Sequence, residues 1–312
     1  MPTLIRLATT TEEINDVLSV RRHALQAKRG MVDPFDLYPE TVNLVAYRDG
    51  KPVGVARFVL FREDHSSPEH VYDFSFDFRD ANRQLPEPTY LLDWFVILPG
   101  LSTEAARILT RRLFEYGVLL LARRQAKSLM GLFPADRLAE GKNDLESFNI
   151  HRISEGVQGE GNQRKMIPFT LSLQDYYLKW VAQIRDREIL RFQDVFFVTL
   201  YEPGEIMFYQ GDKGSTAFLL QEGVVEVVLQ KENEIIPIAE LSESQLVGEI
   251  AMITQEVRTA SLIAKTTVSC ITIERQSFLQ TLERSPHLSM DIFKIFSKRI
   301  SEANRRIVQG HA

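Results

Sequence analysis

The stretch of sequence that decides the fold of the C-terminal half reads Val247-Gly-Glu-Ile-Ala-Met-Ile-Thr-Gln-Glu-Val-Arg-Thr-Ala-Ser261. Gly248 and Glu249 open it, and Arg258 follows after a span that suits a short helical turn. Backbone N–H groups and a guanidinium together hold a phosphate, and a glycine lets the backbone approach the anion closely. A carboxylate accepts a hydrogen bond from a ribose hydroxyl. The segment therefore predicts a site for a ligand that carries a phosphate and a ribose.

This segment resembles the phosphate-binding cassette of the cyclic nucleotide-binding domain family. The family pattern is Gly-Glu-aliphatic-Ala, a short variable helix, and then Arg-x-Ala-Ser/Thr. The matching residues at the family spacing are Gly248, Glu249, Ile250, Ala251, Arg258, Thr259, Ala260 and Ser261. Turns at 201–204 and 210–212 and the glycine at 223 also match, so the resemblance covers residues 195–306. It implies that the cassette binds cyclic AMP or cyclic GMP.

Two features leave details of the pocket open. Residues 243–247 (Glu-Ser-Gln-Leu-Val) stand where the family usually has Gly-Asp-x-Phe, which puts the pocket depth in doubt. Thr259 resembles the position where cyclic GMP-binding relatives place a hydroxyl beside the guanine amino group. Cyclic AMP receptors also carry a hydroxyl there, so both nucleotides stay open. The last helix would cap the base through Ile300, Asn304 and Arg305, unless these residues face solvent or a dimer partner.

The sequence around the cassette predicts an antiparallel β-roll. From residue 195 onward, short strands follow one another at regular spacing with turns between them. Helices at 276–286 and 287–306 would cap the roll. Cys270, the single cysteine, lies in an alternating strand pattern and is expected in the core, and one cysteine excludes an intrachain disulfide.

The N-terminal part alternates helices and strands. The expected elements are a helix opened by Thr10 or Thr11, a hairpin at 42–61 with its turn at 49–50, a buried strand at 90–100 and a capped helix at 103–125. This order resembles the GNAT-type acyltransferase fold, closest to the N-acyl amino acid synthase and autoinducer synthase branch. The fold class expected is α+β: a GNAT-like α/β domain at 1–172, a helical connector at 173–194, and the β-roll with capping helices at 195–312.

The GNAT resemblance implies an acyl donor, either acyl coenzyme A or an acyl carrier protein. The turn at 99–105 departs from the family's glycine-rich phosphate turn, because it has a single glycine and Glu104 would repel a polyphosphate. Asp93 is the candidate general base, and the alternative is a buried aspartate bonded to backbone. Three functions compete: an acyltransferase regulated by the nucleotide, a catalytically silent scaffold that binds an acyl carrier or protein partner, and a wholly structural chain.

Composition sets the outer limits. The 312 residues, 44% of them hydrophobic and 25% charged, suit two globular domains. A net charge of -5 gives no reason to expect a nucleic-acid partner. No apolar run reaches the length of a membrane span and no secretory signal opens the chain, so we expect a cytoplasmic protein. The histidines lack metal-ligand spacing, and a homodimer is left open.

Overall fold

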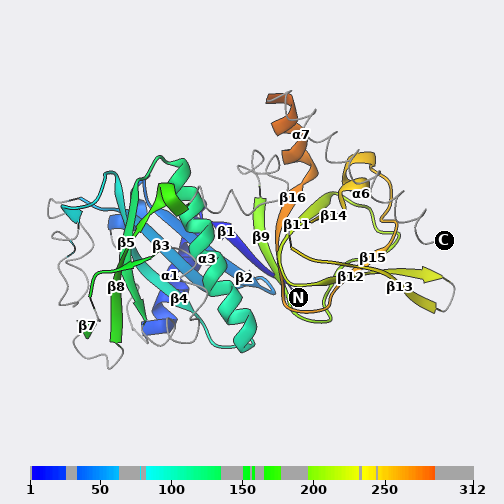
Figure 1. Ribbon diagram of the computed structural model, residues 1–312, viewed down its shortest axis with the longest axis horizontal. Helices are drawn as coiled ribbons and strands as arrows, with labels where there is room; N and C mark the ends of the chain where they lie inside the picture. Colours follow the sequence, from blue (N-terminus) through cyan, green and yellow to red (C-terminus); the bar gives the residue numbers. More distant parts are fainter. Residues whose placement is uncertain are drawn as a thin grey trace. The chain divides into compact units, whose positions relative to one another are not determined.

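The computed structural model describes residues 2–25, 34–62, 78, 82–134, 150–154, 157–158, 165–176, 196–231, 234–243 and 245–284. The chain divides into two compact units, one at Thr3–Trp180 and the other at Val181–Ala312 with Met1–Pro2 (Figure 1). The expected connector helix lies almost wholly outside the described residues, as does the last capping helix with Ile300, Asn304 and Arg305. The domain boundaries expected at 172 and 195 therefore stay predictions.

The N-terminal unit is a mixed sheet covered by helices. Its strands follow the order β1-β2-β3-β4-β5-β8-β6, and β7 also pairs with β8. Its elements are β1 (Thr3–Leu7), α1 (Thr11–Leu25), the 3-10 helix η1 (Pro34–Leu37), β2 (Val42–Arg48), β3 (Lys51–Leu60), β4 (Thr89–Ile97), α3 (Thr103–Arg123), β5 (Ser128–Pro134), β6 (His151–Arg152), β7 (Val157–Gln158) and β8 (Lys165–Ser172).

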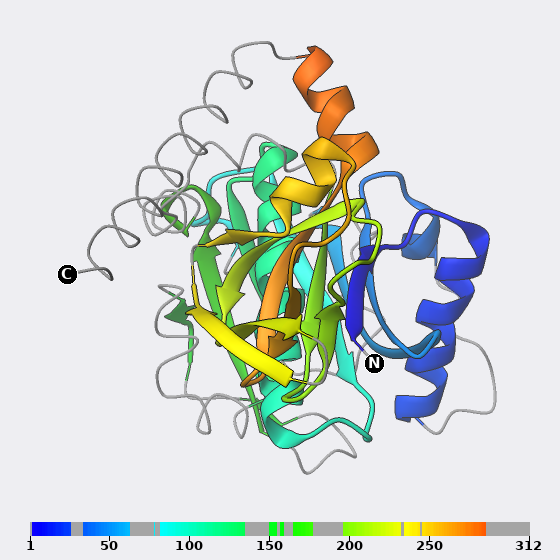
Figure 2. The same ribbon diagram turned by 90° about the vertical axis from the view of Figure 1, so that its right-hand side faces the viewer.

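Helices α1 and α3 cover opposite faces of this sheet, because successive residues of a strand point to opposite sides. Val55 of β3 packs in one cluster with Val17 and other apolar residues of α1. Phe58 of the same strand contacts α3 so closely that a β-carbon on Gly117 would come within 2.1 Å of its ring. Figures 1 and 2 show the two helices on either side of β2 and β3.

Local signals in this unit are confirmed. β2 and β3 pair antiparallel, and Asp49 and Gly50 between them have φ values of 54° and 71°, as a two-residue hairpin turn requires. Ser102 caps α3, since its Oγ accepts a hydrogen bond from the Ala105 N–H at 3.2 Å. Thr10 caps α1 in the same way, with its Oγ1 accepting from the Glu13 N–H.

The C-terminal unit is a β-roll of two antiparallel sheets, ordered β14-β11-β16-β9 and β10-β15-β12-β13. Its elements are β9 (Phe196–Tyr201), β10 (Ile206–Phe208), β11 (Thr216–Glu222), β12 (Val225–Lys231), β13 (Glu234–Leu241), β14 (Leu246–Val247), α6 (Glu249–Thr254), β15 (Ser261–Ala264), β16 (Val268–Glu274) and α7 (Arg275–Arg284). The predicted β-roll is therefore confirmed.

The roll turns from one sheet to the other at Gly223, between β11 and β12. Its φ of 90° is disfavoured for other residues, and a β-carbon there would lie 2.3 Å from the Thr267 carbonyl oxygen. Cys270 of β16 is fully buried, as predicted, and its Sγ lies 3.6 Å from the Thr199 carbonyl oxygen. Across the described residues, no helix is long and apolar enough to cross a membrane.

Candidate functional site

The predicted cassette forms a turn, a short helix and a second turn between strands of the two sheets. Gly248 leaves β14 with a φ of 75° and starts α6, and Gln255 ends that helix with a φ of 62°. The chain then passes Arg258 and enters β15 at Ser261. The left-handed backbone conformation at Gly248 is one that residues with a side chain rarely adopt, which explains the glycine at this position.

Arg258 is the centre of the cassette. The residue is only 4% exposed, although it carries a charge. Its Nη1 donates to the Gly248 carbonyl oxygen at 2.6 Å, and its Nη2 donates to the Thr216 carbonyl oxygen at 2.7 Å. Burial lowers the pKa of Arg258, and the nearby carboxylates of Asp212 and Glu249 oppose that shift. An arginine stays protonated despite such a shift, so the site holds a buried cation.

The turn at 210–212 holds the backbone on both sides of this arginine. The Gly211 N–H donates to the Arg258 carbonyl oxygen at 2.9 Å, and the Arg258 N–H donates to the Asp212 carbonyl oxygen at 2.8 Å. Gly214, which was not among the predicted site residues, lies against the guanidinium. A β-carbon there would come within 2.9 Å of Arg258 Cζ and 2.4 Å of Ala251 Cβ. Its position two residues after the Gly211-Asp212 turn gave no signal of this contact.

The other cassette residues divide into packing and accessible positions. Ala251 and Ala260 are buried in the roll, whereas Ile250 is 54% exposed on α6. The Ser261 hydroxyl accepts from the Gln210 N–H at 2.8 Å, so it fixes the 210–212 turn. Thr259 is exposed, and Glu249 is partly exposed at the start of α6. Thr259 is therefore accessible to a ligand, whereas the Ser261 hydroxyl already accepts a hydrogen bond within the protein.

One polar atom of the cassette fits a bound anion. Arg258 Nε is buried and has no hydrogen-bond acceptor within the part of the chain that the structure describes. A buried N–H without an acceptor is costly, and an anion placed against it would supply the missing partner. A guanidinium presents its N–H groups as a planar fork that suits phosphate oxygens. The donor set therefore fits the phosphate of a small ligand.

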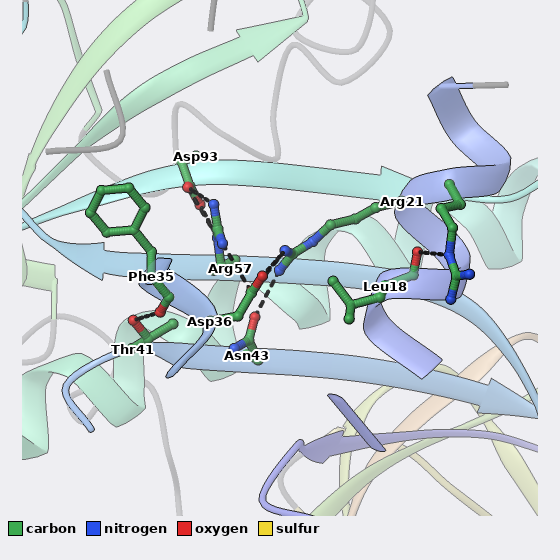
Figure 3. Close-up of polar contacts among 9 residues, drawn as sticks. Leu18, Arg21, Phe35, Asp36, Thr41, Asn43, Arg57 and Asp93 are labelled. Carbon is green, nitrogen blue, oxygen red and sulfur yellow. Dashed lines mark hydrogen bonds and ion pairs between the residues drawn. The ribbon is translucent and has the colours of Figure 1, made fainter. Parts of the chain in front are cut away.

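Asp93, the candidate general base, belongs to a buried chain of alternating charges (Figure 3). Arg57 donates from Nε to both Asp93 carboxylate oxygens at 3.0 Å, and from Nη1 to Asp36 Oδ1 at 2.9 Å. Arg21 of α1 donates to the same Asp36 oxygen at 2.8 Å and to Asn43 Oδ1 at 2.9 Å. The Asp93 carboxylate is thus bonded to a guanidinium. Its role as a general base stays a prediction.

This charged chain was not predicted from the sequence. Arg57 is fully buried in a strand whose neighbours are apolar, and a cation in such a strand needs a buried partner. An arginine within an apolar strand was therefore the one sign in the sequence that a buried ion pair would be found here. Its partners Asp36 and Asp93 come from η1 and β4, which only the folded sheet brings together.

The turn before α3 keeps the negative charge that the sequence indicated. Glu104 lies in the first turn of the helix, and its carboxylate accepts from Arg107 at 2.7 Å. This hydrogen bond lowers the pKa of Glu104, so the carboxylate is ionised at neutral pH. No group of three or more His, Cys, Asp or Glu in the described ranges is placed to hold a metal ion.

Comparison with known proteins identifies the C-terminal segment. Residues 198–285 match the family model described as cyclic nucleotide-binding domain. This segment is therefore a cyclic nucleotide-binding domain, and the resemblance read from the cassette is confirmed there.

Two curated relatives and one solved structure are similar to part of the chain. Human cGMP-dependent protein kinase 2 is 30% identical over 135 residues, 42% of this chain and 17% of the kinase. The cGMP-dependent protein kinase egl-4 of Caenorhabditis elegans is 35% identical over 98 residues, 30% of this chain and 13% of the kinase. The chain thus spans less than a fifth of either relative. The Thermus thermophilus catabolite activator protein is 23% identical and has a TM-score of 0.36, covering 41% of this chain and 60% of its own.

Proposed function

We propose that the C-terminal unit binds a cyclic nucleotide, cyclic AMP or cyclic GMP, and that binding regulates the N-terminal unit. The observation that carries the proposal is the buried Arg258 with its unpartnered Nε, held between Gly248 and Thr216. The guanidinium would hold the cyclic phosphate. Glu249, partly exposed at the start of α6, would accept from the ribose 2′-hydroxyl.

The exposed hydroxyl of Thr259 supports a contact between the cassette and the base or the phosphate. A hydroxyl can accept from the amino group of guanine, which adenine lacks at that position, so Thr259 would then favour cyclic GMP. The relatives named above are called cGMP-dependent. The proposal includes both nucleotides, and titration with each of them measures which one binds more tightly.

For the regulated unit we propose a GNAT-like domain that carries out acyl transfer or binds an acyl carrier or protein partner. Its support is the pairing of β4 with β5. These strands run parallel and pair over Thr89–Leu92 and Ser128–Gly131, whereas β4 continues to Ile97 beside β3. The β5-facing edge of β4 beyond Leu92 could therefore receive an extended pantetheine arm, as a sheet edge receives a strand.

A catalytically silent scaffold is the second candidate for this unit, and two observations favour it. Asp93 is bonded to Arg57 in the interior, and Glu104 keeps a negative charge in the first turn of α3. The first feature argues against a free base. The second places a carboxylate, paired with Arg107, where a polyphosphate would need hydrogen-bond donors. The two candidates differ in whether acyl transfer occurs, which an assay can decide.

Calorimetric titration of the full chain tests the proposal. Cyclic AMP and cyclic GMP are added separately, with 5′-AMP as the control that has an open, doubly charged phosphate. We expect at least one cyclic nucleotide to bind and 5′-AMP to bind much more weakly. A cyclic nucleotide at 100 times its dissociation constant should raise the free energy of unfolding by about 2.7 kcal/mol. If neither cyclic nucleotide produces a heat of binding or changes the free energy of unfolding, the proposal is ruled out.

A further inference from the structure

The aromatic ring of Phe208 lies against the cassette arginine. Phe208 ends β10 and pairs with Leu262 of β15 in the sheet. The distance from Arg258 Cζ to the centre of its ring is 4.2 Å. This is well within the range of about 6 Å over which a ring face attracts a cation. Neither the cassette pattern nor the turn at 210–212 includes this residue.

Phe208 is itself held in place by its neighbours. Its ring stacks with that of Phe218 at a centroid distance of 6.1 Å and an interplanar angle of 21°. A β-carbon on Gly248 would come within 3.2 Å of the Phe208 ring and 2.7 Å of Arg258 Nη1. The ring, the guanidinium and the bare backbone of Gly248 are therefore in mutual close contact.

Two kinds of contact thus restrain the guanidinium. The carbonyl oxygens of Gly248 and Thr216 accept from Nη1 and Nη2, which restrains the charged end of the side chain in its own plane. The Phe208 ring lies against the guanidinium carbon and adds a cation–π contact. An arginine that is ordered before the ligand arrives loses less conformational freedom on binding, and a desolvated cation interacts more strongly with an anion.

We propose that Phe208 is a positioning residue for the nucleotide phosphate, acting through Arg258. The inference rests on the proposed function, because it assumes that Arg258 receives the phosphate. The ring does not touch the ligand in this role. It holds the guanidinium in the orientation that leaves Nε for an anion.

The first test compares side chains that keep or lose the ring face. Phe208→Leu keeps an apolar side chain and removes the ring, and it should weaken cyclic nucleotide binding roughly five- to thirtyfold, as expected for a desolvated cation–π contact. Phe208→Tyr restores the ring and should return affinity to within about threefold of the parent. Phe278→Leu is the matched control: it removes a ring from a separate core cluster of the same unit, to which Phe208 does not belong. It should lower stability and leave affinity within about twofold.

A double-mutant cycle separates positioning from general packing. In an Arg258→Gln background the cation is gone, and Phe208→Leu should then change affinity by less than about twofold. A second readout needs no ligand. The Arg258 Nε–H resonance in a nitrogen-15 spectrum should carry a ring-current shift that disappears in Phe208→Leu and persists in Phe208→Tyr.

The outcomes distinguish the inference from the function on which it rests. A parent protein that binds no cyclic nucleotide overturns the proposed function. A parent that binds, with Phe208→Leu equal to it in affinity, overturns the inference alone. An Arg258 resonance unchanged by Phe208→Leu, or an equal loss of affinity in the Arg258→Gln background, also overturns the positioning role.

Discussion

Arg258 donates from Nη2 to both the carbonyl oxygen and the hydroxyl oxygen of Thr216, at 2.7 and 3.0 Å. Thr216 begins β11 in one sheet of the roll, whereas Arg258 leads into β15 in the other. The same guanidinium therefore connects the two sheets and supplies the cation of the candidate site. Changes to it should alter stability and binding together.

Arg258→Ala should lower the affinity for the cyclic nucleotide by about 2–5 kcal/mol, because it removes the buried cation that would face the phosphate. The domain should stay folded, with a stability loss of about 1–3 kcal/mol from the acceptors left without their partner. Titration calorimetry and urea unfolding measure the two effects. Lys213→Ala is the control, since it removes an exposed positive charge from the neighbouring turn. Unchanged affinity in Arg258→Ala would remove the arginine from the site.

Thr259→Ala should leave stability unchanged, because the residue is exposed. If its hydroxyl bonds the guanine amino group, the variant weakens cyclic GMP and leaves cyclic AMP nearly unchanged. Equal loss for both nucleotides would instead place the hydroxyl on the phosphate. Titration of each nucleotide with the parent and the variant decides, and no loss for either would exclude Thr259 from the site.

Gly248→Ala should destabilise the C-terminal unit by more than a positive φ alone explains. The new methyl group would lie 2.7 Å from Arg258 Nη1 and disturb the buried guanidinium. Gly50→Ala is the matched control, with a φ of 71° and open space around its β-carbon position. We expect about 1 kcal/mol for Gly50→Ala, and about 1–3 kcal/mol more for Gly248→Ala. Equal losses in chemical unfolding would show that the close approach to Arg258 has no energetic consequence.

Asp93→Asn should destabilise the N-terminal unit by about 3–5 kcal/mol, because Arg21 and Arg57 would then share the single carboxylate of Asp36 and one buried positive charge would stay uncompensated. Glu104→Gln, at an exposed ion pair, should cost at most about 0.5 kcal/mol. Urea unfolding followed by tryptophan fluorescence suits the comparison, since Trp94 adjoins Asp93. If Asp93→Asn abolishes acyl transfer while stability stays at the parent value, the residue is catalytic and the ion pair is not its main role.

Acyl coenzyme A should bind weakly or not at all, because the turn at 99–105 has one glycine and Glu104 is charged in the first turn of α3. An acylated carrier protein offers a single phosphate and avoids most of that repulsion. Acyl transfer from each donor, measured with and without cyclic nucleotide, tests the expectation. Efficient turnover of the coenzyme A thioester would contradict it, and turnover from the carrier alone would favour an N-acyl synthase.

The features that could be predicted from the sequence are those whose physical cause is local. The hairpin at Asp49 and Gly50 and the Ser102 cap depend on residues within a few positions of one another. The cassette could likewise be identified because its glycine, carboxylate and arginine lie in one short segment. These interactions form whenever the local backbone conformation forms, so a linear pattern records them.

The hydrogen-bond partners of the buried charged side chains depend on the tertiary structure and could not be predicted from the sequence. Arg57 binds Asp93 from 36 positions away, and Arg258 binds Thr216 from 42 positions away. Such partners are set by strand register and by the way the sheets pack, which a single sequence does not state. The cost of burying a charge requires that each cation find an acceptor, but only the assembled fold determines which oxygen, or which aromatic ring, lies close enough.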